Sequence, residues 1–405
     1  MRILFLAQVL PYPLDAGPKT RAYYVLRYLA QHHRVTLLAF TRPTDPPAAM
    51  AHLARFCEEV QGVPMRRSTL RNVRDLARSL LGRWPFMVRR DWIPEMVRQV
   101  DRQVQSGEYD AVHADQLWMA PYALRGQAIS QRIHGKSLRT VLDQHNAVFQ
   151  IPMRLAHHQP NPLLRGLLHL EATKLQRFER QVCGQFDRVV WVTREDRDAL
   201  VERTGYPGSG DPVIPICVEP EEGALRDHVE RPFRVTFLGG MHWPPNAEGI
   251  QWFADRVWPE LHQAFPQVRL TVIGKEPPAR LRAQAQDPER RIEVLGYVED
   301  PTPYLAETAV FIVPLHAGGG MRVKILDAWR WKLPVVSTSI GAEGIDVRPG
   351  ENILLGDSPQ AFSRHVRALL ADPGRARAMV EEAHATLRRA YHWRRRYRAW
   401  DIVYS

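Results

Sequence analysis

The residues best suited to chemistry lie in residues 309–346, where a run of glycines precedes two cations and an acid. These glycines follow an apolar segment and open a predicted helix of residues 321–331; they are Gly318, Gly319 and Gly320. Backbone N–H groups at such a turn point into open space at the positive end of the helix dipole, which favours an anion such as a diphosphate. Arg322 and Lys324 add positive charge there. We therefore predict an anion site where this helix begins.

Asp327 is the acid of this segment and lies three residues after Lys324, on the same face of the predicted helix. A carboxylate in that place can accept hydrogen bonds from a vicinal diol, as acidic residues do on nucleotide riboses. Two plainer alternatives stay open. The glycines could serve packing alone, or Asp327 could be solvated and paired with Lys324, a pairing worth only about 0.3 to 0.5 kcal/mol. The combination on one short helix between two apolar strands favours a nucleotide site.

The run GMRVKILDAW from Gly320 to Trp329, followed by KLPVVST and GAEGI, resembles the donor-site segment of family-four retaining glycosyltransferases of the GT-B fold. That segment in the family carries two glutamates eight residues apart, whereas this chain has Gly319 and Asp327 at the two positions. The resemblance implies that Asp327 binds the donor ribose. It also implies that the first position contacts the transferred sugar, a contact that Gly319 cannot make with a side chain.

Length and composition limit the classes of protein to which the chain can belong. The chain has 405 residues, enough for two domains with full cores, and its 45% hydrophobic and 24% charged residues are ordinary for a globular protein. No apolar run reaches the roughly 18 to 20 residues that span a bilayer, so we expect a soluble or peripheral protein of the cytoplasm. The three cysteines (Cys57, Cys183 and Cys217) are far apart and fit a reducing cytosol.

Short apolar strands alternate with helices, which predicts an α/β fold of two doubly wound parallel sheets, as in GT-B enzymes. The first series has predicted strands at residues 3–7, 35–40, 111–114, 140–144 and 188–193. Its predicted helices lie at about 20–32, 48–59, 68–82, 94–106 and 162–183. A strand at 213–218 and an acidic turn at 219–223 lead to strands at 234–238, 269–273, 293–295, 309–315, 333–338 and 353–355. We expect domains of residues 1–218 and 219–385 that face each other across a cleft, and a helix of residues 386–405 that packs back on the first.

The segment DQHNA follows the strand at 140–144 and resembles the Asp-x-His-Asn element of the same family. His145 at a strand end can donate a hydrogen bond to a sugar hydroxyl or a phosphate oxygen, although a structural histidine is the alternative. Glu171 and Glu179 on the next helix could simply be solvated. Two alternatives stay open for the loop of residues 11–19. Asp15, Gly17 and Lys19 could contact a ligand, or the loop could be a plain strand-to-helix connection.

Two further segments of the second series carry candidates. Gly239 and Gly240 follow the strand at 234–238 and are expected to face the diphosphate, and Asn246 is expected to cap the next helix. Tyr297 and Val298 match the family stretch whose backbone lies at the edge of the donor base, although a plain strand exit would look the same.

The formal net charge of +11 suits nucleic acid, an anionic membrane surface or phosphorylated ligands. Residues 66–90 contain one acid, Asp75, and eight arginines: Arg66, Arg67, Arg71, Arg74, Arg78, Arg83, Arg89 and Arg90. Apolar residues of the same segment recur at three- and four-residue spacing and form one stripe: Leu70, Val73, Ala77, Leu80 and Trp84. We expect this segment to lie on an anionic membrane surface, at the inner face of the plasma membrane. The alternative is a stripe that covers the core of the first domain.

Near the end of the chain, four aromatic residues recur at spacings of four, three and four: Trp393, Tyr397, Trp400 and Tyr404. With the arginines between them they could stack on single-stranded nucleic acid. The resemblance implies instead that the terminal helix packs on the first domain, and we expect packing and no nucleic-acid partner.

The resemblance as a whole implies a retaining glycosyltransferase, of the hexosyltransferase type, that moves a sugar from a nucleoside-diphosphate sugar to a glycan or lipid-linked acceptor in surface-polysaccharide or glycolipid assembly. We assign catalysis to Arg322, Lys324 and His145, and expect no metal and no cofactor because the two cations stabilise the leaving diphosphate. The residues assigned to the diphosphate are Gly17, Gly239, Gly240, Gly318, Gly319, Gly320, Arg322 and Lys324. A nucleotide-sugar 2-epimerase of the same fold, an inactive nucleotide-sugar-binding protein and a nucleic-acid-binding protein are the alternatives.

Overall fold

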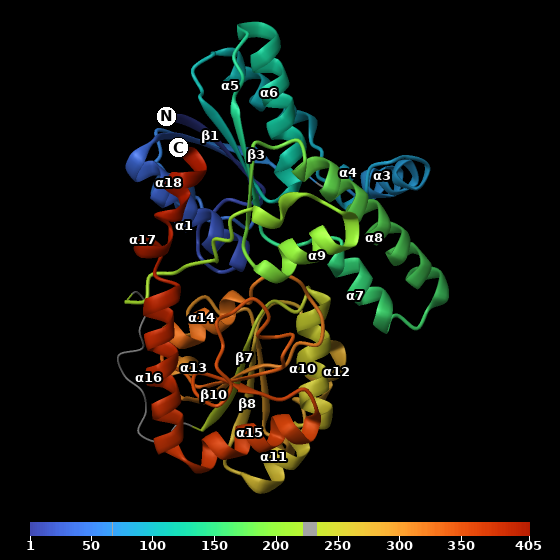
Figure 1. Ribbon diagram of the computed structural model, residues 1–405. Helices are drawn as coiled ribbons and strands as arrows, with labels where there is room; N and C mark the ends of the chain where they lie inside the picture. Colours follow the sequence, from blue (N-terminus) through green and yellow to red (C-terminus); the bar gives the residue numbers. More distant parts are fainter. Residues whose placement is uncertain (67, 222–232) are drawn as a thin grey trace. The chain divides into compact units, whose positions relative to one another are not determined.

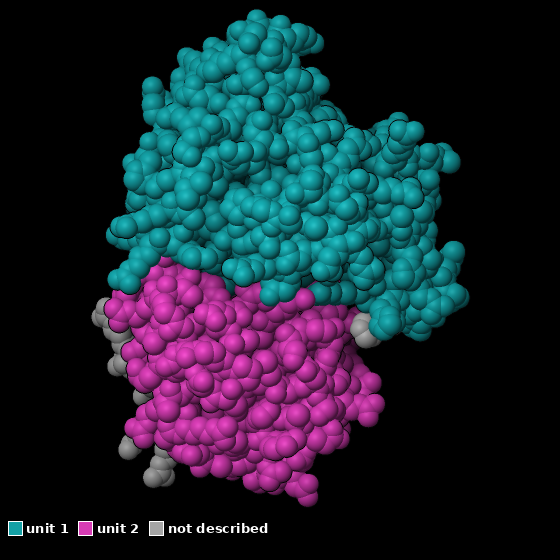
Figure 2. Space-filling model, in the orientation of Figure 1, with its two compact units in different colours: residues 1–217, 319–321, 393–405 teal, residues 218–318, 322–392 magenta. Residues whose placement is uncertain are grey.

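The computed structural model describes residues 1–66, 68–221 and 233–405, except for the side chain of His158. Arg67 and part of the predicted turn at 219–223 lie outside the described residues. The chain forms two compact units, coloured separately in Figure 2. Unit 1 comprises Met1–Cys217, Gly319–Met321 and Trp393–Ser405, and unit 2 comprises Val218–Gly318 and Arg322–His392.

Unit 1 is built on a parallel sheet whose described strands have the order β3-β2-β1-β4-β5-β6. The strands are β1 (Arg2–Ala7), β2 (Arg34–Thr41), β3 (Glu59–Pro64), β4 (Ala111–Asp115), β5 (Arg139–Gln144) and β6 (Arg188–Trp191). Ala7 pairs with Asp115, and Asp115 pairs with Asp143, so the carboxyl ends of the three central strands lie level. The strands are almost continuously apolar because helices cover both faces.

The helices of unit 1 surround this sheet (Figure 1). They are α1 (Gly17–His32), α2 (Ala48–Leu53), α3 (Thr69–Leu81), α4 (Phe86–Arg90), α5 (Pro94–Gln105), η1 (Leu117–Met119), α6 (Ala120–His134), α7 (Gln150–His158), α8 (Pro162–Cys183), α9 (Arg194–Thr204), η2 (Gly208–Gly210), α17 (Trp393–Arg396) and α18 (Ala399–Tyr404). Apolar residues of α5, α6 and α8 pack on one face of the sheet. On the other face Phe5 stacks on His113, whose Nδ1 lies 2.7 Å from the hydroxyl of Tyr404 in α18.

Unit 2 is built on a second parallel sheet, with described strands in the order β12-β11-β10-β7-β8-β9. The strands are β7 (Arg234–Leu238), β8 (Arg269–Ile273), β9 (Ile292–Gly296), β10 (Thr308–Val313), β11 (Val335–Ser337) and β12 (Leu354–Leu355). The helices are α10 (Pro244–Arg256), α11 (Trp258–Ala264), α12 (Ala279–Gln284), η3 (Pro288–Arg290), α13 (Thr302–Ala306), α14 (Val323–Arg330), α15 (Pro359–Ala371) and α16 (Pro373–Ala390). Apolar residues of α10, α11 and α15 form the core with the sheet.

Both sheets have the same topology when each is numbered from its own first strand, and both match the predicted doubly wound α/β class. The chain moves outward from the first strand in one direction and then returns to its other side with the fourth strand. Ligands of such sheets bind outside the carboxyl ends of the strands, where the order reverses. That point lies between β1 and β4 in unit 1, and between β7 and β10 in unit 2.

Three predictions of secondary structure are wrong. The helix predicted for 48–59 ends at Leu53, and β3 follows it; its sequence EVQGVP carries a glycine and a proline, which are tolerated on this edge strand. The strand predicted at 213–218 is reduced to isolated bridges at Val213 and Val218. No single helix spans 386–405, because the backbone of Tyr391 and His392 bonds to Val218 instead of continuing α16.

The aromatic stripe of the C-terminal segment is buried, as the packing expectation required. Trp393, Tyr397, Trp400 and Tyr404 are each at most 4% exposed within unit 1. Rings buried in this way are not a surface on which bases can stack.

Candidate active site

Lys324 lies at the switch point of the sheet of unit 2, against the turn that follows β7. Its Nζ donates a hydrogen bond to Oδ1 of Asn246, 2.9 Å away, and stands 4.6 Å from the ring centroid of Phe237. A Cβ added to Gly239 would lie 2.6 Å from this Nζ. Position 239 therefore has to be glycine for the ammonium group to occupy its place beside the backbone.

The environment of Lys324 weakens its hold on a proton. Burial, reinforced by the nearby Arg322, lowers the pKa of Lys324 to about 7, although Asp327 acts in the opposite direction. An anion bound at this place would favour the charged ammonium. The lysine can thus take up a proton as a diphosphate binds.

The side chain of Arg322 lies against Gly318, as that of Lys324 lies against Gly239. A Cβ at Gly318 would stand 2.8 Å from Nη2 of Arg322 and 2.9 Å from the indole of Trp243. Gly318 has φ of +130° and Gly320 has φ of +72°, conformations that favour glycine, whereas Gly319 has no such constraint and its added Cβ would meet no atom closer than 3.8 Å. The helix begins at Val323, two residues later than predicted, because these residues form the turn.

Asp327 forms an ion pair with Arg330, one turn further along α14, at 3.2 Å. The alternative in which Lys324 is its partner is therefore wrong, since Lys324 bonds to Asn246. Burial raises the pKa of Asp327, while Arg330 and Lys324 partly offset this effect. The carboxylate remains partly exposed and can accept a further hydrogen bond.

Asn246 is not the predicted helix cap. Trp243 occupies the N-cap position of α10, and Asn246 lies inside the first turn, where its Nδ2 donates to the carbonyl oxygen of Gly240 at 2.8 Å. Together with the bond from Lys324, this makes Asn246 the link between the glycine turn after β7 and the cation of α14. No local pattern predicts this link, because Asn246 and Lys324 are 78 residues apart in the chain.

Tyr297 and Val298 follow the carboxyl end of β9 directly, on the same edge of the sheet as Gly239. Tyr297 is 58% exposed, and Nζ of Lys275 stands 4.3 Å from its ring centroid. Both residues thus lie outside the carboxyl end of a strand, where ligands of such sheets bind, and their contact with a base stays a prediction.

In unit 1 the corresponding edge carries a buried ion pair. Arg21 of α1 is 0% exposed and binds both carboxylate oxygens of Asp143 at 2.9 Å. Its remaining Nη1 donates to the carbonyl oxygen of Pro215 and to the hydroxyl of Tyr397. Burial alone would raise the pKa of Asp143, but Arg21 and His145 outweigh it, so this pKa lies below its ordinary value.

His145 sits beside this pair, and its ring is already engaged. Its Nε2 lies 2.9 Å from Oδ1 of Asp115, at the end of β4, and 3.9 Å from Oδ2 of Asp143. If Asp115 is ionised it can only accept, so Nε2 donates this hydrogen bond and Nδ1 is the ring nitrogen left to contact a ligand. The role of His145 toward a sugar or phosphate stays a prediction.

Two buried carboxylates hold the loop after His145. Glu179 of α8 accepts hydrogen bonds from the backbone N–H groups of Val148 and Phe149, and Asp196 accepts one from Ala147. Burial raises the pKa of Glu179 to about 8. The alternative in which Glu179 is simply solvated is therefore wrong.

Glu171 also has hydrogen-bond partners, so the alternative in which it is simply solvated is wrong as well. Its carboxylate accepts from the N–H groups of Phe86 and Met87 at the start of α4. Both glutamates thus accept hydrogen bonds from backbone N–H groups that have no partner within their own helix or loop.

The loop before α1 pairs its own charges. Nζ of Lys19 lies 3.0 Å from Asp15 and 3.8 Å from Asp45, and Gly17 is the first residue of α1. Neither alternative for this loop is excluded by these contacts.

Among the described residues, Asp115, Asp143 and His145 lie close enough to share a metal ion. They do not fit one well, because the guanidinium of Arg21 already occupies both oxygens of Asp143. The second such group is Glu219, Glu221 and His392 in unit 2.

The organising roles of four residues were not predicted: Arg21, Asp115, Glu179 and Asn246. Asp115 could have been identified, because it is a polar residue at the carboxyl end of an apolar strand. Arg21 had no such signal, because a single arginine near the start of a helix is usually solvated.

Residues 16–222 match the family described as Glycosyltransferase Family 4, and residues 232–372 match the family described as Glycosyl transferases group 1. The first match alone spans more than half of the chain. The chain therefore belongs to glycosyltransferase family 4, a family of retaining glycosyltransferases. This confirms the resemblance seen in the donor-site segment.

Individual proteins add detail. The chain is 23% identical over 198 residues to an "Uncharacterized 44.6 kDa protein in cps region" of Klebsiella pneumoniae, covering 46% of this chain and 48% of that protein. It is 30% identical over 99 residues to the "Lipopolysaccharide core biosynthesis glycosyltransferase LpsE" of Rhizobium meliloti (strain 1021), covering 24% of this chain and 29% of that protein. The matched regions thus span half or less of these relatives.

Among solved structures, Anabaena Alr3699/HepE in complex with UDP and glucose is similar over 100% of this chain and 99% of its own, with a TM-score of 0.67 and 15% identity. This likeness concerns the fold, which is GT-B, as predicted. Within the described part of the chain, no helix has the length and apolar character needed to cross a bilayer.

Proposed function

We propose that the protein transfers a sugar from a nucleoside-diphosphate sugar to a glycan or lipid-linked acceptor with retention of anomeric configuration. The observation that carries the proposal is the cationic site of unit 2, in which Lys324 and Arg322 lie against Gly239 and Gly318 at the carboxyl edge of a doubly wound sheet. Such a site suits a diphosphate, which is the leaving group of the reaction.

The chemistry we propose is displacement on one face of the sugar. The bond from the anomeric carbon to the diphosphate oxygen breaks as the acceptor hydroxyl oxygen bonds to that carbon, and the hydroxyl proton passes to the leaving diphosphate. Lys324 and Arg322 stabilise the charge that develops there, a role in which removed groups typically cost about 10² to 10³ in rate. Asp327 is proposed to bind the ribose, and Tyr297 and Val298 to border the base. We propose no metal for this step.

In unit 1 we propose that His145 orients the sugar or the acceptor through Nδ1, since Asp115 engages Nε2. Glu179 and Asp196 act as positioning residues, because they hold the backbone that follows His145.

The acceptor class is proposed from the relatives. One is named for a cps region and another for lipopolysaccharide core biosynthesis, which supports a surface polysaccharide or glycolipid acceptor. UDP and glucose, present in the HepE complex, are the first ligands to test. A lipid-linked acceptor would call for contact with an anionic membrane surface, which we propose for residues 66–90 at the inner face of the membrane.

The test starts with thermal unfolding of the full chain against a panel of nucleoside-diphosphate sugars. A matched donor at about 100 times its dissociation constant should add roughly 2.7 kcal/mol of stability. That donor with a glycan or lipid-linked acceptor, in the presence of a chelator, should give a product whose anomeric proton coupling shows retention. Isomerised sugar formed without acceptor would instead assign a 2-epimerase, and no response to any nucleoside diphosphate would contradict the proposal.

A further inference from the structure

Helix α3 carries its apolar residues outward. Its buried residues are Asp75 and Ser79, whereas Leu70, Val73 and Leu81 are 82%, 61% and 94% exposed. A helix on the surface of a globular protein normally turns its apolar stripe toward the core. The alternative in which this stripe covers the core of the first domain is therefore wrong. Trp84 also does not belong to the stripe, since it lies beyond the end of α3.

Hydrogen bonds on the polar side of α3 impose this orientation. Arg71 donates from Nη2 to the carbonyl oxygen of Trp92 at 2.7 Å, and its Nε lies 3.4 Å from Asp75. One and two turns further along the same face, Asp75 and Ser79 are buried, and Ser79 donates to the carbonyl oxygen of Trp84 at 2.9 Å. Turning the leucines inward would break these bonds. Their exposure is thus a property of the folded unit.

Helix α8 adds a second set of exposed leucines: Leu163, Leu164, Leu167 and Leu170. Leu163, Leu167 and Leu170 share one helical face with Lys174 by their spacing. Nζ of Lys174 donates to the carbonyl oxygens of Ser79 and Gly82, the latter at 3.0 Å, at the end of α3. Lys174, at the C-terminal end of this face of α8, therefore contacts the end of α3, and Figure 1 shows both helices at the periphery of unit 1.

Positive charge surrounds these leucines. Arg74, Arg78 and Arg83 are exposed, while Asp75, the acid of the segment, is buried beside Arg71. A hollow of about 380 Å³ lies next to α3, and four arginines line it: Arg71, Arg74, Arg78 and Arg89. The carboxylate of Asp75 also lines it and is paired with Arg71. The Nε of Arg89 is buried without a hydrogen-bond partner among the described residues. Guanidinium groups around a small hollow suit a phosphate group.

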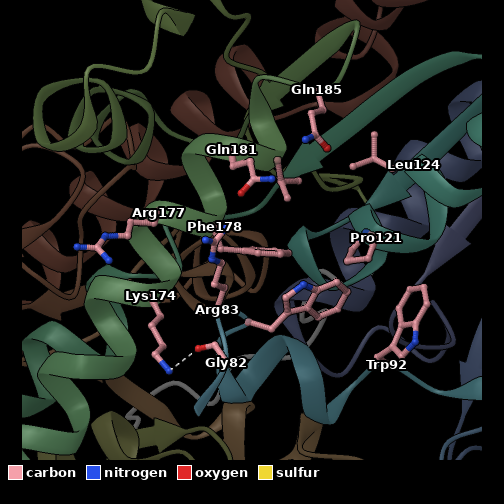
Figure 3. Close-up of a pocket in the computed structure, with 12 residues that line it drawn as sticks. Gly82, Arg83, Trp92, Pro121, Leu124, Lys174, Arg177, Phe178, Gln181 and Gln185 are labelled. Carbon is pink, nitrogen blue, oxygen red and sulfur yellow. Dashed lines mark hydrogen bonds between the residues drawn. The ribbon is translucent and has the colours of Figure 1, made fainter. Parts of the chain in front are cut away.

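A larger hollow of about 800 Å³ adjoins the first and is aromatic (Figure 3). Trp84 and Trp92, which line both hollows, have ring centroids 5.7 Å apart, and Phe178 lies 5.8 Å from Trp84. In Figure 3 Phe178 reaches from α8 toward Pro121 of α6, and Arg177 points away from the hollow. The volume is in the range of ligand sites, and the lining suits an apolar chain.

We propose that α3, the first turns of α8 and these two hollows form a lipid-binding face that engages one phospholipid of an anionic bilayer. The leucines enter the interface of the bilayer, the arginine-lined hollow takes the lipid phosphate, and the aromatic hollow takes part of an acyl chain. A polar partner would leave the leucines exposed to water, and a neutral apolar partner would leave the arginines without counter-charge; an anionic lipid surface satisfies both. This lipid-binding face specifies how the membrane contact in the proposed function is made. Its biological purpose rests on that proposed function.

Co-sedimentation of the full chain with vesicles tests the face without any glycosyl transfer, so its failure and failure of the transferase activity are measured separately. We expect binding to vesicles that contain phosphatidylglycerol, weaker binding at high salt, and little binding to phosphatidylcholine alone. Replacing exposed leucines (Leu70→Gln, Leu81→Gln, Leu163→Gln) should weaken binding by about tenfold or more. Arg74→Gln with Arg78→Gln should weaken it and reduce its dependence on salt.

Matched controls lie elsewhere in unit 1. Ile133 and Ile402 are exposed apolar residues outside the face, so Ile133→Gln with Ile402→Gln should bind like the wild type. Arg132→Gln is the control for an exposed cation on α6. All these side chains are at the surface, and unchanged thermal unfolding would verify that the variants fold.

A second measurement addresses the hollows. Phospholipid with brominated acyl chains should quench part of the tryptophan fluorescence, and Trp84→Phe with Trp92→Phe should remove that part. The inference is overturned by equal, negligible binding to both vesicle types, or by leucine variants that bind as the wild type does. Displacement of the protein from vesicles by millimolar glycerol phosphate would assign the arginines to a soluble anion instead. Leucine variants that lose self-association, with no vesicle binding in the wild type, would assign the face to a second copy of the chain.

Discussion

Units 1 and 2 share one strand order, yet the carboxyl edges of their sheets differ in how charge is handled. In unit 1 the charges satisfy one another: Arg21 binds both oxygens of Asp143, and His145 binds Asp115. In unit 2 the ammonium of Lys324 is hydrogen-bonded to a neutral amide and lies against a glycine. The fold thus supplies the position of a site, whereas the side chains decide what it can bind.

The two arrangements also differ in what they do for the protein. A buried ion pair is roughly neutral for stability but specifies geometry, and Arg21 joins α1, β5, Pro215 and Tyr397 into one arrangement. Among the described residues no carboxylate lies within ion-pair distance of Lys324, so its buried charge is unfavourable in the empty protein and its pKa is lowered. Local unfavourable arrangements of this kind are typical of functional sites.

The largest effect is expected from removing the buried ion pair between Arg21 and Asp143 in unit 1. Arg21→Met should lower the free energy of unfolding by about 3 to 5 kcal/mol, because Asp143 is left buried without a counter-charge. Urea unfolding measures the loss. In the matched control, Arg21→Met with Asp143→Asn, part of the stability should return because the orphaned charge is gone. Equal stability of the single and double variants would show that the pair does not act as a unit.

Removing the cation of unit 2 should leave the fold intact and affect turnover. Lys324→Ala should reduce turnover with a matched donor and acceptor by about 10² to 10³, with activity retained in chelator. Arg256→Ala, an exposed cation at the end of α10, is the control and should behave as the wild type. Activity abolished by chelator and restored by a divalent ion would overturn the assignment of charge stabilisation to the cations.

A smaller effect is expected at the acid of the same helix. Asp327→Asn should weaken nucleoside-diphosphate binding by about 1.5 to 3 kcal/mol, the range for hydrogen bonds to a charged group. Calorimetry measures this difference. Arg330→Gln removes the ion-pair partner but keeps the carboxylate, so it should bind nearly as well as the wild type. Unchanged affinity of the Asp327→Asn variant would exclude the ribose contact.

The smallest effect is expected in the pH dependence of donor affinity, which Lys324 at the carboxyl edge of the sheet of unit 2 should cause. The pKa of Lys324 is about 7 in the free protein, and a bound diphosphate would raise it. Affinity for the donor should therefore be full below pH 7 and fall by up to about tenfold per pH unit above it, until the pKa of the complex is reached. Lys324→Arg should remove this fall, since arginine stays charged. A wild type with constant affinity from pH 6 to 9 would refute the shift.

Local patterns predicted much of the fold. The bounds of α8, β7 and β8 agree with the predicted helix and strands, because their period and their end signals lie within the segments themselves. Asp327 and Lys324 could be named as candidate site residues for the same reason, because both lie on one short helix. By contrast β3 was missed, because an edge strand with a glycine and a proline gains its order from pairing with β2.

Patterns within single segments were enough to predict the α/β class, the strand ends that carry glycines or polar residues, and the family of the donor-site segment. Contacts between distant segments were needed to learn that Arg21 meets Asp143, 122 residues away, and that Asn246 links Gly240 to Lys324. The outward orientation of the leucines of α3 likewise depends on such contacts. Periodicity states which residues of a helix share a face, but the hydrogen bonds of Arg71 and Ser79 to distant backbone decide which face is buried.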